Sequence, residues 1–221
     1  FFARGLRDGL GSKEHEWTGA RMSGAAIIER PELTLPPAEA AHVRSAYADA
    51  DVILEYGSGG STIVASELPG KTVFSVESDQ AWAEMMQTYL AQNAPASATR
   101  VDVIWADVGP TKEWGYPQTN KGWRRFADYP LGVWELPEFK QPDVVLVDGR
   151  FRAGCVMATA FLTKGPVRLL VDDYKRRKYY HKVEEFLGTP RLIGRMAEFD
   201  VHPMPVPATR LREIFTMMTR P

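Results

Sequence analysis

The sequence contains only one cysteine, Cys155, among its 221 residues. An internal disulfide is therefore excluded, which fits a reducing compartment. Cys155 lies within an apolar helical pattern. This setting predicts a small buried core residue in preference to a catalytic thiol.

Long hydrophobic runs are also missing, since no apolar stretch approaches the roughly 20 residues of a membrane-spanning helix. The first apolar residues are followed by charged ones, where a signal peptide would have its apolar core. No excess of one charge sign exists either, because the formal net charge is -1. We therefore expect a soluble cytoplasmic protein without a membrane or nucleic-acid partner, and homo-oligomerisation stays open.

The length and the 44% hydrophobic content suit one large domain with a single core. Residues 1–24 are rich in glycine and charge and have little periodicity. We interpret them as an N-terminal extension, within which Met22 offers an internal start. Residues 25–221 are predicted to form the domain.

From Pro36 onward, short β-branched runs alternate with helical patterns, which predicts a parallel sheet covered by helices. The segments 192–201 and 212–218 are expected to pair as a final antiparallel hairpin. The predicted strands are 52–54, 72–76, 101–105, 144–147 and 167–171. The predicted helices are 36–47, 61–68, 79–90, 151–162 and a segment that ends near 187. An apolar stripe in the third of these helices is predicted to be core: Trp82, Met85, Met86, Tyr89 and Leu90.

A glycine-rich loop, Gly57-Ser58-Gly59-Gly60, separates the first predicted strand from a helix. Glycines there allow close backbone approach to a ligand, and the helix N-terminus offers free N–H groups. Glu77 follows twenty residues after Gly57 at the end of the second strand, where a carboxylate can accept hydrogen bonds from ribose hydroxyls. A tight turn and a solvated strand-end acid are the alternatives.

NAD or FAD is the natural competitor for such a loop, through the pattern G-x-G-x-x-G. Gly57 and Gly59 fit that pattern, but Thr62 stands where the third glycine would be. The first strand also runs into an acid, Glu55, at the start of the loop. The E-x-G-x-G form resembles the glycine motif of methyltransferases that use S-adenosylmethionine (SAM), and the missing third glycine favours SAM over NAD.

This loop form and the order of elements resemble the class I SAM-dependent methyltransferases over most of residues 36–221. The resemblance implies a three-layer, Rossmann-like, doubly wound α/β fold. Its seven-stranded, mostly parallel sheet would have the order 3-2-1-4-5-7-6. It also places Asp107, at the end of the third strand, near the adenine amino group. The cofactor-binding residues it implies are Glu55, Gly57, Ser58, Gly59, Ser61, Glu77, Asp107 and Asp148.

Acids also end the fourth and fifth predicted strands, and these are the candidate catalytic residues: Asp148, Asp172 and Asp173. One of the last two would cap the following helix, which leaves the other unexplained. The set resembles the Mg²⁺ site of catechol-type O-methyltransferases, with oxygen ligands for the metal. We favour basic neighbours instead of a metal ion as the compensating charges: Arg150, Arg152 and Lys175.

The acceptor side gives the remaining functional expectations. Residues 148–151, Asp-Gly-Arg-Phe, lack the Asp/Asn-Pro-Pro-aromatic loop of enzymes that methylate nucleobase amino groups. The basic run 175–178 is interpreted as a solvated face, although its place beside the site also suits an anionic acceptor. We expect methyl transfer to a small, anionic acceptor. A non-catalytic binding protein and an NAD(P)-dependent oxidoreductase are the alternatives.

The connection 108–142 is long for two core strands and is rich in aromatic residues. A lid over the acceptor site and a surface that packs on the core or forms a dimer interface are equally supported. No histidine stands out as a general base, since His181 lies beyond the site and the other three are distant in sequence.

Overall fold

The computed structural model describes residues 28–221, so the predicted extension 1–24 lies outside the described residues. Within this range a seven-stranded sheet forms, in the order β3-β2-β1-β6-β7-β9-β8. This is the order 3-2-1-4-5-7-6 once the two short strands β4 and β5 are set aside, and it confirms the expected fold. The strands are β1 (Val52–Tyr56), β2 (Thr72–Glu77), β3 (Arg100–Trp105), β6 (Val144–Val147), β7 (Val167–Val171), β8 (Arg191–Ile193) and β9 (Met196–Val201).

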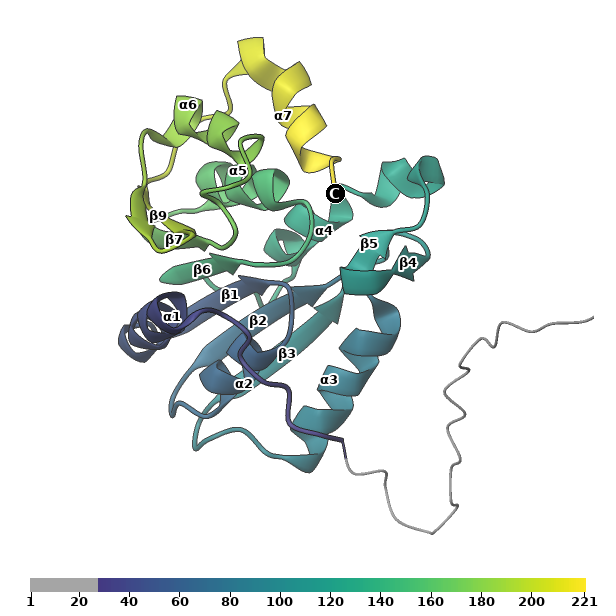
Figure 1. Cartoon of the computed structure of the whole chain (residues 1–221), viewed down its shortest axis with the longest axis vertical. Coiled ribbons are helices and arrows are strands. Elements are labelled where there is room, and N and C mark those ends of the chain that lie inside the picture. The colour runs from purple at the N-terminus through teal and green to yellow at the C-terminus, as the bar shows by residue number, and fades with distance from the viewer. Residues whose placement is uncertain (1–27) are drawn as a thin grey trace, which may run out of the picture.

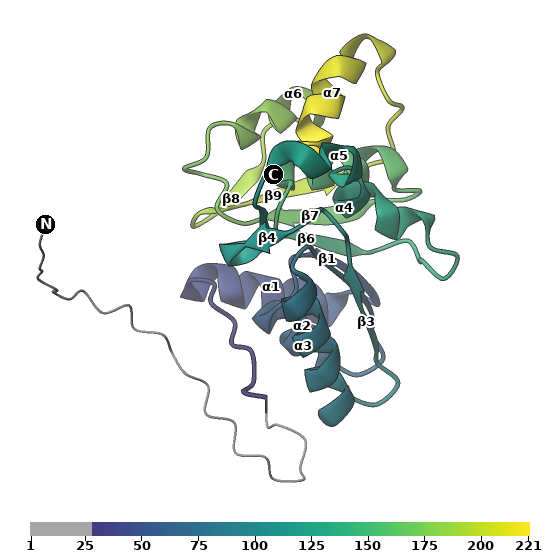
Figure 2. The same ribbon diagram turned by 90° about the vertical axis from the view of Figure 1, so that its right-hand side faces the viewer.

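Helices cover both faces of this sheet, as Figures 1 and 2 show. On one face lie α1 (Pro37–Asp49), α2 (Gly60–Ser66) and α3 (Gln80–Gln92). On the other lie α4 (Asp128–Leu131), α5 (Arg152–Leu162), α6 (Glu184–Leu187) and α7 (Leu211–Met218).

Alternate strand residues build the two cores. In β1, Leu54 and Tyr56 pack with the α5 side, whereas Ile53 packs with α1. All four residues of β6 are buried because the central strand is covered on both faces. The parallel ladders of β1, β2, β3, β6 and β7 bring their carboxyl ends to one edge of the sheet.

The C-terminal hairpin is shorter than predicted. β8 and β9 pair antiparallel within residues 191–201, and β9 pairs antiparallel with β7. The predicted strand 212–218 is instead the helix α7, which buries Ile214, Met217 and Met218. That prediction was wrong because these apolar residues repeat at helical spacing, and a short apolar run does not itself distinguish strand from helix.

The helix α3 begins as the sequence suggested, with the Asp79 side chain accepting a hydrogen bond from the Trp82 backbone N–H at 2.9 Å. Its apolar stripe is only partly core. Met86, Tyr89 and Leu90 are buried, whereas Trp82 is 42% exposed and Met85 is half-buried. The prediction that all five stripe residues are core was therefore wrong.

No helix begins directly after β7 among the described residues. Residues 172–176 and 178–179 form turns, and a 3₁₀ helix, η4 (Tyr180–Val183), precedes α6. Neither Asp172 nor Asp173 caps a helix, so the predicted capping role was wrong. The basic run 175–178 is exposed, as a solvated face requires.

The long connection 108–142 has two structurally different halves. Its second half packs on the core through Phe126, Tyr129 and Val133, which are buried. Its first half forms a small antiparallel ribbon of β4 (Thr111–Lys112) and β5 (Tyr116–Pro117) joined by the 3₁₀ turn η1 (Glu113–Gly115). Three further 3₁₀ segments are η2 (Asn120–Arg125), η3 (Gly132–Glu135) and η5 (Ala208–Arg210).

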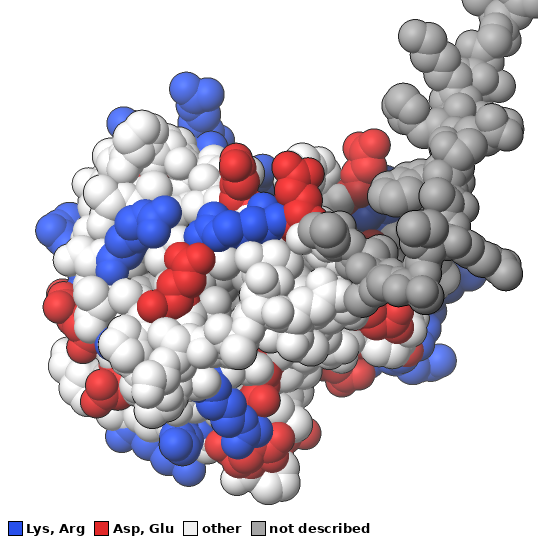
Figure 3. Space-filling view, turned by 90° about the horizontal axis from the view of Figure 1, so that it is seen from below, with Lys and Arg blue, Asp and Glu red and all other residues white. Residues whose placement is uncertain are grey.

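Two expectations from composition can be compared with the structure. Cys155 is fully buried, as predicted. In residues 28–221 no helix has the length and apolar character that a membrane crossing requires. Figure 3 shows basic and acidic side chains interspersed over the face it views, in keeping with the small formal net charge.

Candidate functional site

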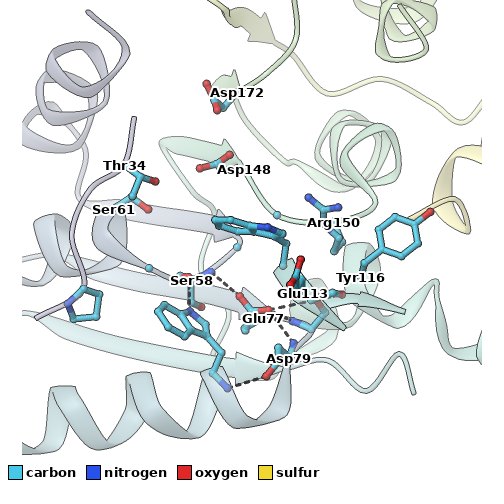
Figure 4. A pocket seen from close by; sticks show the side chains of 18 of the residues that line it. Thr34, Ser58, Ser61, Glu77, Asp79, Glu113, Tyr116, Asp148, Arg150 and Asp172 are labelled. Atoms are coloured by element: carbon cyan, nitrogen blue, oxygen red, sulfur yellow. Dashed lines mark hydrogen bonds between the residues drawn. The ribbon is translucent and has the colours of Figure 1, made fainter. Parts of the chain in front are cut away.

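A cavity of about 1610 Å³ lies at the carboxyl ends of the parallel strands, where open α/β sheets bind ligands. Figure 4 shows side chains from several loops converging on it. Eight of the predicted site residues line this one cavity: Gly57, Ser58, Gly59, Ser61, Glu77, Asp148, Asp172 and Asp173. Glu55 and Asp107 do not line it.

The loop after β1 crosses the loop after β6 with no room for side chains. A Cβ on Gly57 would lie 2.7 Å from the Gly149 backbone N, and the φ of Gly57 is +108°. A Cβ on Gly149 would lie 2.1 Å from the Tyr129 hydroxyl. Glycine is therefore required at both positions, one for conformation and space and the other for space.

At Gly59, neither the backbone conformation nor a steric contact requires glycine. Its φ is 170°, which any residue adopts, and a Cβ there would meet nothing within 4 Å. Because Gly59 lines the cavity, the missing side chain leaves cavity volume free. The loop thus keeps open space in front of the N-terminus of α2.

Glu77 is held by backbone donors at the end of β2. One carboxylate oxygen accepts from the N–H groups of Ser78 at 2.7 Å and Asp79 at 2.9 Å. The other accepts from the Ser58 N–H at 3.2 Å. Burial raises the pKa of Glu77, and these hydrogen bonds oppose that shift. The carboxylate joins the glycine loop to the end of the neighbouring strand.

Glu55 lies behind the loop and not in the cavity. Its carboxyl group accepts hydrogen bonds from the hydroxyls of Tyr47 at 2.6 Å, Thr62 at 2.6 Å and Ser75 at 3.0 Å. Thr62 in turn accepts from the Gly59 N–H at 3.0 Å. Complete burial raises the pKa of Glu55. Its predicted contact with a ligand is therefore replaced by a structural role, in which it fixes the loop through Thr62.

Asp107 is also outside the cavity. One of its oxygens accepts from the Gly109 N–H at 2.8 Å, and the other forms an ion pair with Arg125. Its position after β3 matches the sequence prediction, but the structure turns the carboxylate toward η2. The Arg125 side chain supplies the physical reason, since it offers a charged partner away from the cavity.

Trp82 is a cavity residue that the sequence analysis missed. Its indole N–H donates to the Ser58 carbonyl oxygen at 2.8 Å, so the first turn of α3 supports the glycine loop. Met85 also lines the cavity. The sequence did not distinguish these two residues from the core, because a residue at the edge of an apolar stripe has the same spacing as a core residue.

We call the part of the cavity at the carboxyl ends of β6 and β7 the acceptor side, after its expected role. There each predicted acid has an arginine. Asp172 is fully buried and is held by two hydrogen bonds from Arg195, at 3.0 and 2.5 Å. Asp173 pairs with Arg177 at 3.0 Å. Asp148 pairs with Arg152 at 3.1 Å.

These arginines correct the predicted set of basic neighbours. Arg152 is a partner as expected, whereas Lys175 and Arg150 pair with none of the three acids. Arg195 comes from the turn between β8 and β9, and no local sequence signal ties it to Asp172. No group of three or more histidine, cysteine or acidic side chains within residues 28–221 is arranged to hold a metal ion.

The pKa of Asp148 is unusually high for an aspartate. Burial raises its pKa to about 6, with further contributions from Asp172 and Asp173, while Arg152 acts in the opposite direction. Its side chain is 33% exposed, and it lines the cavity. A carboxyl group with this pKa is mostly charged at neutral pH. Its pKa is also close enough to neutral for the group to accept and release a proton.

Two further segments contribute to the lining. Residues 31–35, before α1, had no sequence signal, whereas residues 112–116 of the β4–β5 ribbon belong to the long connection 108–142 that the sequence singled out. None of His42, His181 and His202 lines it. His181 instead stacks on Tyr174 with ring centroids 4.8 Å apart.

The sheet order, the glycine loop and a strand-end carboxylate in one cavity define a Rossmann-like methyltransferase domain. No protein-family model and no curated protein sequence matches the chain. Among solved structures, a methyltransferase-like protein from Silicibacter pomeroyi DSS-3 is 59% identical, with a TM-score of 0.85. The match covers 87% of this chain and 99% of that protein. The chain belongs to the class I SAM-dependent methyltransferase family.

Two more distant structures share the fold. The cofactor-bound protein Rv0187 from MTB is 17% identical, with a TM-score of 0.54, over 80% of this chain and 85% of that one. A SAM-dependent O-methyltransferase from Thermotoga maritima is 11% identical, with a TM-score of 0.50, over 80% of this chain and 69% of that one.

Proposed function

We propose that the protein transfers the methyl group of SAM to a hydroxyl group of a small, anionic acceptor. The observation that carries this proposal is the pairing, in one cavity, of the glycine loop and Glu77 with the titratable carboxyl group of Asp148. The first two features suit an adenosyl ligand, and the third suits a proton acceptor. Family membership supports the choice of SAM over NAD.

The residues present fit this cofactor. Space without a side chain at Gly59 lies beside the loop, and Glu77 offers carboxylate oxygens for hydroxyl donors. Ser58, Ser61 and Trp82 line the same region. When bound, SAM supplies a methyl group on a positively charged sulfur, which leaves as a neutral thioether once the methyl has been transferred.

The chain's own residues would position the acceptor and receive its proton. Asp148 accepts the proton of the acceptor hydroxyl as its oxygen gains the methyl group, and Arg152 keeps the carboxylate in place. Asp172 and Asp173 remain paired with arginines, so they act as positioning residues that hold the loop after β7. Alignment in a closed site supplies most of the rate enhancement for such a displacement.

A thermal melting experiment on the full chain tests the cofactor. We expect SAM and S-adenosylhomocysteine (SAH) to raise the melting temperature and NAD to leave it unchanged. Gly59→Leu should abolish the ligand-induced shift, because its side chain would fill the free cavity space. Stabilisation by NAD alone would contradict the proposal.

Gly132→Leu is the matched control. A Cβ at Gly132 also meets nothing within 4 Å, but this residue does not line the cavity. Its ligand-induced shift should equal that of the unmodified chain. An equal loss in both variants would show that the effect at Gly59 is not local.

A further inference from the structure

Arg150 is the one cavity-lining arginine without a charged partner among the described residues. Its guanidinium group makes no hydrogen bond within residues 28–221, and its Nε atom is buried and unsatisfied. Burial lowers the pKa of Arg150. A buried donor without a partner is costly, so such a group is commonly completed by something that binds.

The neighbouring charges show why Arg150 differs. Arg152 pairs with Asp148 and Arg177 pairs with Asp173, whereas Arg195 pairs with both Asp172 and Asp173. Those carboxylates are therefore already compensated. Lys112 and Glu113, from the β4–β5 ribbon, add one charge of each sign to the lining. Among the lining arginines, Arg150 is therefore the one whose guanidinium group is in no ion pair within residues 28–221.

An aromatic ring lies next to this charge. The Arg150 guanidinium carbon is 5.8 Å from the centroid of the Tyr116 ring, and the Lys112 ammonium nitrogen is 5.1 Å from the same centroid. Tyr116 is 37% exposed and lines the cavity. The ring thus gives the cavity a flat aromatic wall with two cations close to it.

The position of this wall separates it from the glycine-loop side. In Figure 4, Arg150 and Tyr116 lie together on one side of the cavity, whereas Thr34 and Ser61 lie on the other. Asp148 lies between the two groups, and Ser58 and Glu77 lie below it. A ligand at Arg150 can therefore extend toward Asp148 from the side opposite Ser61.

We propose that Arg150, Tyr116 and Lys112 form a subsite for the carboxylate of an aromatic hydroxy acid. This inference rests on the proposed function, since the ligand would be the methyl acceptor. The planar fork of the guanidinium matches a carboxylate through two parallel hydrogen bonds. The ring of the acid would pack on Tyr116, and its hydroxyl group would point to Asp148.

Calorimetric titration of the SAH-loaded full chain with three probes tests the subsite. The probes are 4-hydroxybenzoate, its amide 4-hydroxybenzamide, and 4-hydroxycyclohexanecarboxylate, which lacks the aromatic ring. We expect the amide to bind about tenfold more weakly than the benzoate, because a hydrogen bond to a charged group is lost. The non-aromatic acid should bind several-fold more weakly. Failure of 4-hydroxybenzoate to bind at millimolar concentration would overturn the subsite.

Three variants separate the contributions. Arg150→Met should remove the preference for the acid over the amide, and Tyr116→Leu should remove the preference for the aromatic ring. Arg124→Met is the matched control, because Arg124 also lies over an aromatic ring, Trp123, at 5.3 Å, but outside the cavity. This control should bind all three probes as the unmodified chain does.

The alternative outcomes are distinct from a failure of the proposed function. If SAH binds but the acid and the amide bind equally, the subsite is wrong and the cofactor site stands. If Arg150→Met weakens SAH and not 4-hydroxybenzoate, Arg150 serves the cofactor instead. If inorganic phosphate displaces 4-hydroxybenzoate at lower concentration than benzoate itself does, the carboxylate assignment is wrong. If SAH does not bind at all, the proposed function fails first.

Discussion

The two sides of the cavity satisfy their carboxylates in opposite ways. On the glycine-loop side, Glu55 and Glu77 are held by hydroxyl and backbone N–H donors. On the acceptor side, Asp148, Asp172 and Asp173 are held by arginines. Neutral donors fix a geometry without adding charge, whereas arginines cancel the charge as well. The first arrangement suits recognition of hydroxyl groups, and the second leaves a region where one extra cation matters.

The largest effect is expected on stability, when an arginine on the acceptor side is replaced. Arg195→Met leaves the fully buried Asp172 without its cation. We expect this variant to lose about 3 kcal/mol in the free energy of unfolding, measured by urea denaturation. Arg177→Met, at an exposed pair, should lose less than about 1 kcal/mol.

A second substitution distinguishes charge from packing at this position. Replacing Asp172 with Asn in the Arg195→Met background should restore part of the lost stability, since the uncompensated charge is gone. Equal losses for Arg195→Met and Arg177→Met would contradict the view that the acceptor side depends on charge cancellation.

On the glycine-loop side the expected effect is on binding. Glu77→Ala should weaken SAH binding by about 1.5–3 kcal/mol, the value of hydrogen bonds to a charged group. Calorimetry measures the dissociation constant, and circular dichroism checks that the variant is folded. Asp107→Ala is the matched control, because that carboxylate ends a neighbouring strand but lies outside the cavity. An unchanged dissociation constant for the folded Glu77 variant would show that the ribose site lies elsewhere.

Ligand affinity near Asp148, which lies between the two sides of the cavity, should depend on pH. The pKa of Asp148 is raised to about 6, so the group is neutral below that pH and charged above it. A positive sulfonium near the carboxylate favours the charged form. The affinity for SAM relative to SAH should therefore rise as the pH increases through about 6. An effect of one pKa unit corresponds to about 1.4 kcal/mol, or tenfold.

This comparison of SAM and SAH isolates the charge, because the two ligands differ by the methyl group and its positive sulfur. Asp148→Asn should make the ratio independent of pH in the same range. A ratio that still rises in this variant would assign the titration to another group.

The smallest effect concerns the support of the loop. Trp82→Phe removes the N–H that donates to the Ser58 carbonyl while keeping an aromatic ring. We expect SAH affinity to fall by about 1 kcal/mol, the net value of one hydrogen bond. Trp123→Phe is the control, since Trp123 is comparably exposed but lies outside the cavity. A larger loss at Trp123 than at Trp82 would contradict this assignment.

Local features were readable from the sequence, and distant ones were not. The glycine loop and Glu77 could be placed because strand ends, loop glycines and one acid follow each other within about one βα unit. Arg195 could not, since it reaches Asp172 through a hairpin 23 residues further on. Glu55 was placed at the right strand end but on the wrong side of the glycine loop, because a sequence does not show that the hydroxyls of Tyr47, Thr62 and Ser75 converge on it.

The fold was predicted better than its last element. The buried run of β6 and the turn residues around the parallel strands are strong signals, whereas 212–218 is a short apolar run with two interpretations. Trp82 shows the converse error at the site, because a side chain that supports the loop has the spacing of a core residue.

The β4–β5 ribbon is attached by hydrogen bonds to the residues directly after Glu77, which ends β2. The Thr111 hydroxyl donates to Asp79 at 2.7 Å, and the Ser78 hydroxyl donates to the Gly115 carbonyl at 2.9 Å. Ser78 and Asp79 are also the residues whose N–H groups hold the Glu77 carboxylate. A ligand that tightens Glu77 therefore also steadies the ribbon that carries Tyr116. Occupancy of either side should then raise the affinity of the other by the same factor.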